Sequence, residues 1–68
     1  MIAVDKLRGV IAERGYSQRK MADFLGMTSK TFYEKMKKGV FDSDEMQQMI
    51  DILEIEDPAG IFFAKAGA

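Results

Sequence analysis

The 68-residue sequence contains no cysteine, no histidine and no tryptophan, and only one proline. Without cysteine no disulfide can form, and nothing in the composition indicates an oxidising compartment. Histidine and cysteine are also the usual zinc ligands and catalytic bases or nucleophiles, and no spacing of the carboxylates resembles a metal site. We therefore expect no enzymatic activity, no metal, no cofactor and no small-molecule ligand.

Long apolar runs are missing as well. The longest one near the C-terminus, residues 61–64, is far shorter than the roughly 20 residues that a membrane span requires. Residues 1–5 have no basic segment followed by an apolar stretch, so a secretory signal is not expected. We expect a cytoplasmic protein without membrane contact, in which residues 1–68 form one domain with a modest core.

The charges are distributed unevenly along the chain, although the net charge is only −1. Residues 14–39 carry seven cations and two anions, a net charge of +5, whereas residues 40–68 carry one cation and seven anions, a net charge of −6. A basic segment of this kind is suited to attract nucleic-acid phosphates. The alternative is that two solvated faces merely differ in sign.

Apolar residues at helical spacing and capping residues predict five helices and no strand, an all-α fold. Asp42 has the position of an N-cap, with Glu45 three residues later as in a capping box. Asp57 and Pro58 are an N-cap followed by a proline at the first helical position. The predicted helices cover residues 4–14, 18–25, 29–38, a segment beginning after Asp42, and residues 58–64.

The second and third of these helices are separated by a very short turn, residues 26–28. Ser17 and Thr28 each precede a helix as N-caps, and Gly26 supplies the positive φ that ends the first of the two. Ala22 is small where the two helices should cross. These features predict a helix-turn-helix, whose second helix can enter the major groove of DNA.

From about residue 7 to residue 63 the sequence resembles the small DNA-binding domains of the Cro and lambda-repressor superfamily, and most of all its short phage-borne regulators. The matching residues are Ser17-Gln18, Ala22, Leu25-Gly26, Thr28, Phe32, Met36 and the segments 41–46 and 53–55. The resemblance implies a compact five-helix domain that acts as a sequence-specific transcriptional regulator. It also implies double-stranded DNA as the partner and a homodimer on a paired half-site operator.

The exposed early face of residues 29–38 carries the expected base contacts, Ser29, Lys30 and Tyr33. Side chains near the N-terminus of a recognition helix reach base edges. Lysine donates to guanine, serine can contact several bases, and tyrosine can hydrogen-bond or pack on a thymine methyl. The alternative is an ordinary solvent-exposed face on a small helical domain.

Long cations around such a helix are better suited to bind phosphates than to read bases, because phosphate contacts supply sequence-independent affinity. The alternative for each is a solvated side chain, and Thr31 can instead bond to its own helix. Gln18 is included only because the family resemblance implies it. The expected phosphate contacts are Gln18, Arg19, Thr28, Thr31, Lys35, Lys37 and Lys38.

Three consecutive large apolar residues, Ile61, Phe62 and Phe63, end the expected fifth helix. A short helix is not expected to bury all three, so we expect this cluster to form the dimer contact. The alternative is packing over the outer faces of the first and fourth helices. A different function is also open: a protein-interaction module, such as an antirepressor or adaptor, whose acidic residues 42–57 meet a basic partner without reading DNA.

Overall fold

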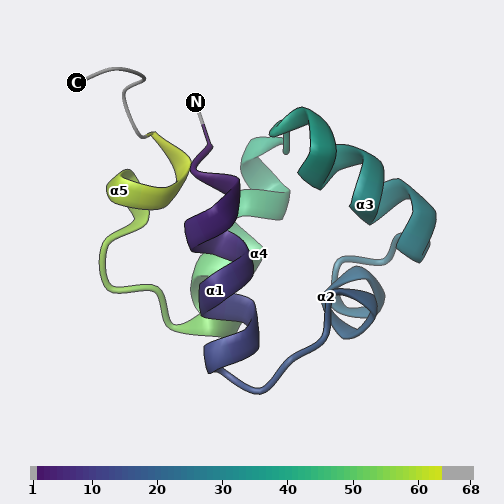
Figure 1. Ribbon diagram of the computed structural model, residues 1–68, viewed down its shortest axis with the longest axis horizontal. Helices are drawn as coiled ribbons and strands as arrows, with labels where there is room; N and C mark the ends of the chain where they lie inside the picture. Colours follow the sequence, from purple (N-terminus) through teal and green to yellow (C-terminus); the bar gives the residue numbers. More distant parts are fainter. Residues whose placement is uncertain (1, 64–68) are drawn as a thin grey trace.

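The computed structural model describes residues 2–63, which contain five helices and no strand, so the all-α fold is confirmed (Figure 1). The helices are α1 Val4–Glu13, α2 Gln18–Phe24, α3 Ser29–Lys38, α4 Ser43–Leu53 and α5 Pro58–Phe62. The bounds of α3 are those expected. Helix α5 ends at Phe62, and residue 64, where it was expected to end, lies outside the described residues. No helix in this part of the chain is long and apolar enough to cross a membrane.

Helices α4 and α5 begin where their capping residues predict. The Asp42 carboxylate accepts from the Glu45 amide at 2.8 Å, and the Glu45 carboxylate accepts from the Asp42 amide at 3.0 Å, completing the capping box of α4. This exchange satisfies two amides that the helix itself leaves without partners. Asp57 likewise accepts from the Gly60 amide at 3.2 Å ahead of α5, with Pro58 as the first helical residue.

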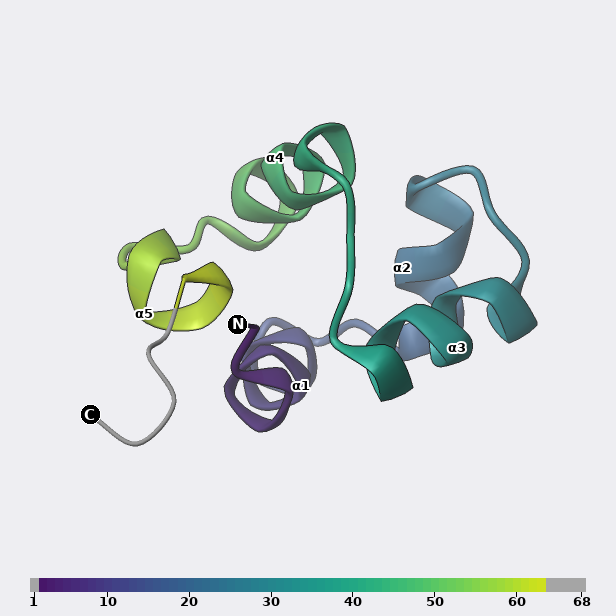
Figure 2. The ribbon, with the colours of Figure 1, turned by 90° about the horizontal axis from the view of Figure 1, so that it is seen from above.

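Helix α1 occupies the centre of the arrangement. Figure 1 shows it in front of α4, with α2 and α3 to one side and α5 to the other, and in Figure 2 it lies between α5 and α3. The amide of Ala3 donates to the Ile61 carbonyl at 2.6 Å, which ties the segment before α1 to α5. The helix-turn-helix is thus held against one side of a small frame made by α1, α4 and α5.

The core is formed by apolar side chains from all five helices and from the segments that flank them. The Phe32 and Phe41 rings, 5.7 Å apart, join α3 to the segment before α4. Met21, Met36 and Met49 are buried, whereas Met46 is half-buried at the margin. The buried residues are Ile2, Leu7, Ile11, Met21, Ala22, Phe32, Met36, Phe41, Met49, Leu53, Ile61 and Phe62.

The C-terminal apolar cluster divides between core and surface. Ile61 and Phe62 are buried, because α5 packs against α1 and directs both side chains inward. Phe63, the residue after the helix, is 66% exposed. Two of the three residues expected at a dimer contact are therefore committed to the core of their own chain, and only Phe63 is presented on the surface.

Candidate nucleic-acid interface

Helices α2 and α3 form the expected helix-turn-helix, and the turn between them has a defined geometry. The Met27 amide donates to the Ala22 carbonyl at 3.0 Å and the Gly26 amide to the Asp23 carbonyl at 3.1 Å, the two bonds of a Schellman motif. Gly26 has φ +72°, as predicted, a value that residues with a Cβ avoid. Ala22 is fully buried in α2, which packs against α3.

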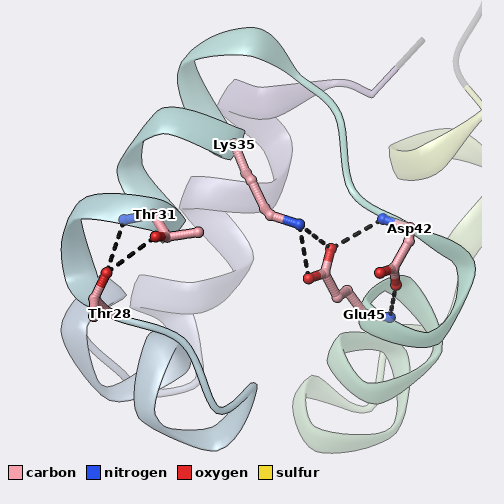
Figure 3. Close-up of polar contacts among 5 residues, drawn as sticks. All are labelled: Thr28, Thr31, Lys35, Asp42 and Glu45. Carbon is pink, nitrogen blue, oxygen red and sulfur yellow. Dashed lines mark hydrogen bonds and ion pairs between the residues drawn. The ribbon is translucent and has the colours of Figure 1, made fainter.

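N-caps begin both helices of the motif. The Ser17 hydroxyl accepts from the Lys20 amide at 3.0 Å, and the Thr28 hydroxyl accepts from the Thr31 amide at 3.2 Å. The Thr28 and Thr31 hydroxyls are also hydrogen-bonded to each other at 3.0 Å, so both expected phosphate contacts have local partners (Figure 3). Both caps are confirmed, and they fix where α2 and α3 start relative to the turn.

Helix α3 has one buried face and one free face. Phe32 and Met36 anchor it in the core, while Lys30 is exposed, Tyr33 is 51% exposed and Ser29 is half-buried. Lys30 and Tyr33 are thus exposed on the first half of a helix that Phe32 and Met36 fix in the core, whereas Ser29, three residues before Phe32, lies at the edge of the buried face. Such an arrangement presents side chains to a groove without the helix having to move.

The cations expected around this helix are not equivalent. Arg19, Lys37 and Lys38 are exposed, and none has an ion pair within residues 2–63. Gln18 is half-buried at the start of α2. The three exposed cations are available to a polyanion approaching α3, which is the property that phosphate contacts require.

Lys35 differs from the other cations of α3. Its ammonium lies 2.8 Å from both carboxylate oxygens of Glu45 in α4, as Figure 3 shows. The pair is partly withdrawn from solvent, with the Lys35 side chain 31% exposed and that of Glu45 only 13% exposed. The residue expected at a phosphate therefore has a carboxylate partner within the domain.

Arg14, also counted in the basic segment, serves another part of the fold. Its guanidinium donates to the carbonyls of Leu53 and Glu54, at 2.9 and 3.3 Å, beside the end of α4. It thus contributes to packing between α1 and α4. Sequence reasoning missed both this contact and the Lys35–Glu45 pair, because their partners are 39 and 10 residues apart and no local pattern connects them.

An aromatic contact in α2 was also missed. The Lys20 ammonium lies 5.5 Å from the centre of the Phe24 ring, which in turn meets Tyr16 edge-on at 5.6 Å. Phe24 is 45% exposed. The i, i+4 spacing of Lys20 and Phe24 was the available signal, since residues four apart share a helix face.

Comparison with known proteins finds one family. Residues 6–39, half of the chain, match the model of the bacterial regulatory proteins of the Fis family, and the match spans most of α1 together with the whole helix-turn-helix. No curated protein and no solved structure matches the chain. The match supports a helix-turn-helix DNA-binding domain of a transcriptional regulator, and it does not extend to the Cro and lambda-repressor superfamily in particular. The chain belongs to the Fis family of bacterial regulatory proteins.

Proposed function

We propose that this protein binds double-stranded DNA sequence-specifically, with α3 in the major groove, and thereby regulates transcription. The observation that carries the proposal is the two-sided character of α3. Phe32 and Met36 hold one side in the core, and Lys30 and Tyr33 project from the other. The major groove, about 12 Å wide, admits one α-helix of about that diameter.

The base contacts in this proposal are Ser29, Lys30 and Tyr33. Lys30 donates to the O6 and N7 acceptors of a guanine, the contact with the greatest discrimination among the three. Ser29 and Tyr33 flank it and read or pack against neighbouring bases. All three belong to the first turns of α3, next to the N-cap Thr28.

Phosphates are bound around the helix by side chains from both members of the motif. Arg19, Lys37 and Lys38 supply charge, while Gln18, Thr28 and Thr31 supply uncharged hydrogen bonds. The Thr31 hydroxyl accepts from that of Thr28, so its own hydrogen remains for a phosphate oxygen. Lys35 is left out of this set because its ammonium is paired with Glu45.

Two copies of the chain act together in this proposal, in the manner of the phage-borne repressor and Cro proteins. One recognition helix reads too few base pairs to select one site in a genome. A two-fold dimer places two such helices about 34–36 Å apart, on successive turns of one DNA face. Phe63, 66% exposed, is the proposed centre of the contact between copies.

Selection of bound duplexes from a random DNA pool tests the proposal. We expect enrichment of one motif, arranged as two related half-sites, and binding that weakens steeply with salt. A folded protein that enriches no motif and shows no salt-sensitive binding to duplex DNA would refute it. That outcome would instead favour the protein-interaction module, with the acidic residues 42–57 as its contact surface.

A further inference from the structure

The side of α3 that faces α4 carries Lys35, one helical turn after Thr31 on the same flank. Figure 3 shows the Lys35 side chain extending across the gap to Glu45 rather than out into solvent. Both carboxylate oxygens lie 2.8 Å from its ammonium. A lysine ammonium bound in this two-pronged way has its charge matched by a single carboxylate.

Glu45 is itself held in place by α4. One of the two oxygens that contact the Lys35 ammonium, Oε1, also accepts the Asp42 amide at 3.0 Å in the capping box. The carboxylate therefore has a fixed position set by the first turn of its helix, and its side chain is only 13% exposed. This fixed acceptor distinguishes the pair from exposed ion pairs between two mobile side chains, which contribute little.

A helix in the major groove turns its two flanks toward the two sugar-phosphate backbones, because it nearly fills the width of the groove. A free lysine at position 35 would accordingly add a phosphate contact, as Lys37 and Lys38 are proposed to do. Such a contact raises affinity for every sequence alike and adds nothing to the distinction between sequences.

We propose that Glu45 withholds Lys35 from the DNA backbone, and that this ion pair lowers both the affinity and the salt dependence of binding to every duplex, without changing the distinction between sequences. The inference rests on the proposed function. Glu45 acts here as a positioning residue: it meets no base or phosphate, and it sets how many cations of α3 are free to meet them.

The test is Glu45→Gln, because glutamine keeps the oxygen that accepts the Asp42 amide and removes only the charge. Binding to a random-sequence duplex is measured from about 0.05 to 0.3 M salt, with thermal melts to confirm that each variant is folded. We expect about five- to tenfold tighter binding at about 0.1 M salt and a log–log salt slope steeper by about 0.9, the signature of one more neutralised phosphate. Affinity for the selected motif should rise by the same factor, so the ratio of specific to sequence-independent binding should stay unchanged.

The matched control is the double variant Lys35→Gln with Glu45→Gln, which we expect to return to the slope of the unaltered protein. A Glu45→Gln slope equal to that of the unaltered protein would overturn the inference. So would a double variant that keeps the steeper slope, since loss of the Glu45 charge alone would then be the cause. If the unaltered, folded protein binds no duplex at low salt, the proposed function fails first and this inference fails with it.

Discussion

The Arg14 guanidinium donates to the Leu53 carbonyl oxygen at 2.9 Å, and so connects the residue after α1 to the last residue of α4. The final carbonyls of a helix have no intrahelical partner and carry partial negative charge, so a cation there is favourable on both counts. This contact links the C-terminal ends of α1 and α4, two of the helices that support the helix-turn-helix.

Replacing Arg14 tests that role. Arg14→Met keeps the aliphatic stem and removes the hydrogen bonds, so we expect a loss of about 1 kcal/mol in the free energy of unfolding, measured by urea denaturation. The salt slope of DNA binding should not change, because the guanidinium is engaged within the domain. Arg8→Met is the control: within residues 2–63 the Arg8 guanidinium pairs with the exposed Asp5 alone, and its loss should leave stability unaltered. A flatter DNA slope for Arg14→Met would contradict this assignment.

The positive φ of Gly26 can be tested by replacing this glycine with alanine and making the same replacement at Gly9 as a control. Gly26→Ala should destabilise the domain by about 1–2 kcal/mol, because alanine is strained at positive φ. A Cβ at Gly26 meets nothing within 4 Å, so backbone strain is the only cost.

Gly9→Ala is the matched control for that change. Gly9 lies inside α1, and a Cβ there also has nothing within 4 Å. Alanine should therefore stabilise the helix by about 0.5–1 kcal/mol. The free energy of unfolding, measured by chemical denaturation, should fall for Gly26→Ala and rise for Gly9→Ala. A shift of the same sign in both variants would rule out the strain argument.

Lys37 and Lys30 are expected to affect DNA binding in different ways. Lys37→Ala should weaken binding to all duplexes alike and reduce the salt slope by about 0.9, because one phosphate contact is lost. Lys30→Ala should in addition lower discrimination at one base pair of the selected motif by about 1–3 kcal/mol. Titrations against the motif and its single-base variants measure both effects. Equal losses on every duplex for both variants would remove Lys30 from the base-reading set.

Phe63 and Phe62 give a contrasting pair for the dimer. Phe63→Asp should leave the domain folded, since the side chain is 66% exposed, while abolishing the steeper-than-linear dependence of DNA binding on protein concentration. Phe62→Asp should unfold it, because Phe62 is 2% exposed and a carboxylate at this position would be buried in the apolar core. Sedimentation that shows monomers on a saturated operator would reject the dimer and leave DNA binding standing.

Local patterns and distant contacts differ in how well the sequence predicts them. The bounds of α3 follow from the capping chemistry of Thr28 and Gly39, which acts within one helical turn: Thr28 is the predicted N-cap, and Gly39 ends the helix with φ +69°. The partners of Arg14 and Lys35 depend on how α1 and α3 pack against α4, which no local pattern encodes. For the same reason the sequence alone did not predict that Ile61 and Phe62 are buried while Phe63 is exposed. This difference depends on the angle at which α5 meets α1.

The core contact between Phe32 and Phe41 crosses the boundary of the family match, which ends at residue 39. The matched residues therefore bury part of their apolar surface against a segment that lies outside the match. A fragment ending at residue 39 would expose Phe32 and Met36 to water and should not fold by itself. Moving residues 6–39 into another protein would accordingly require a surface there that covers Phe32 and Met36.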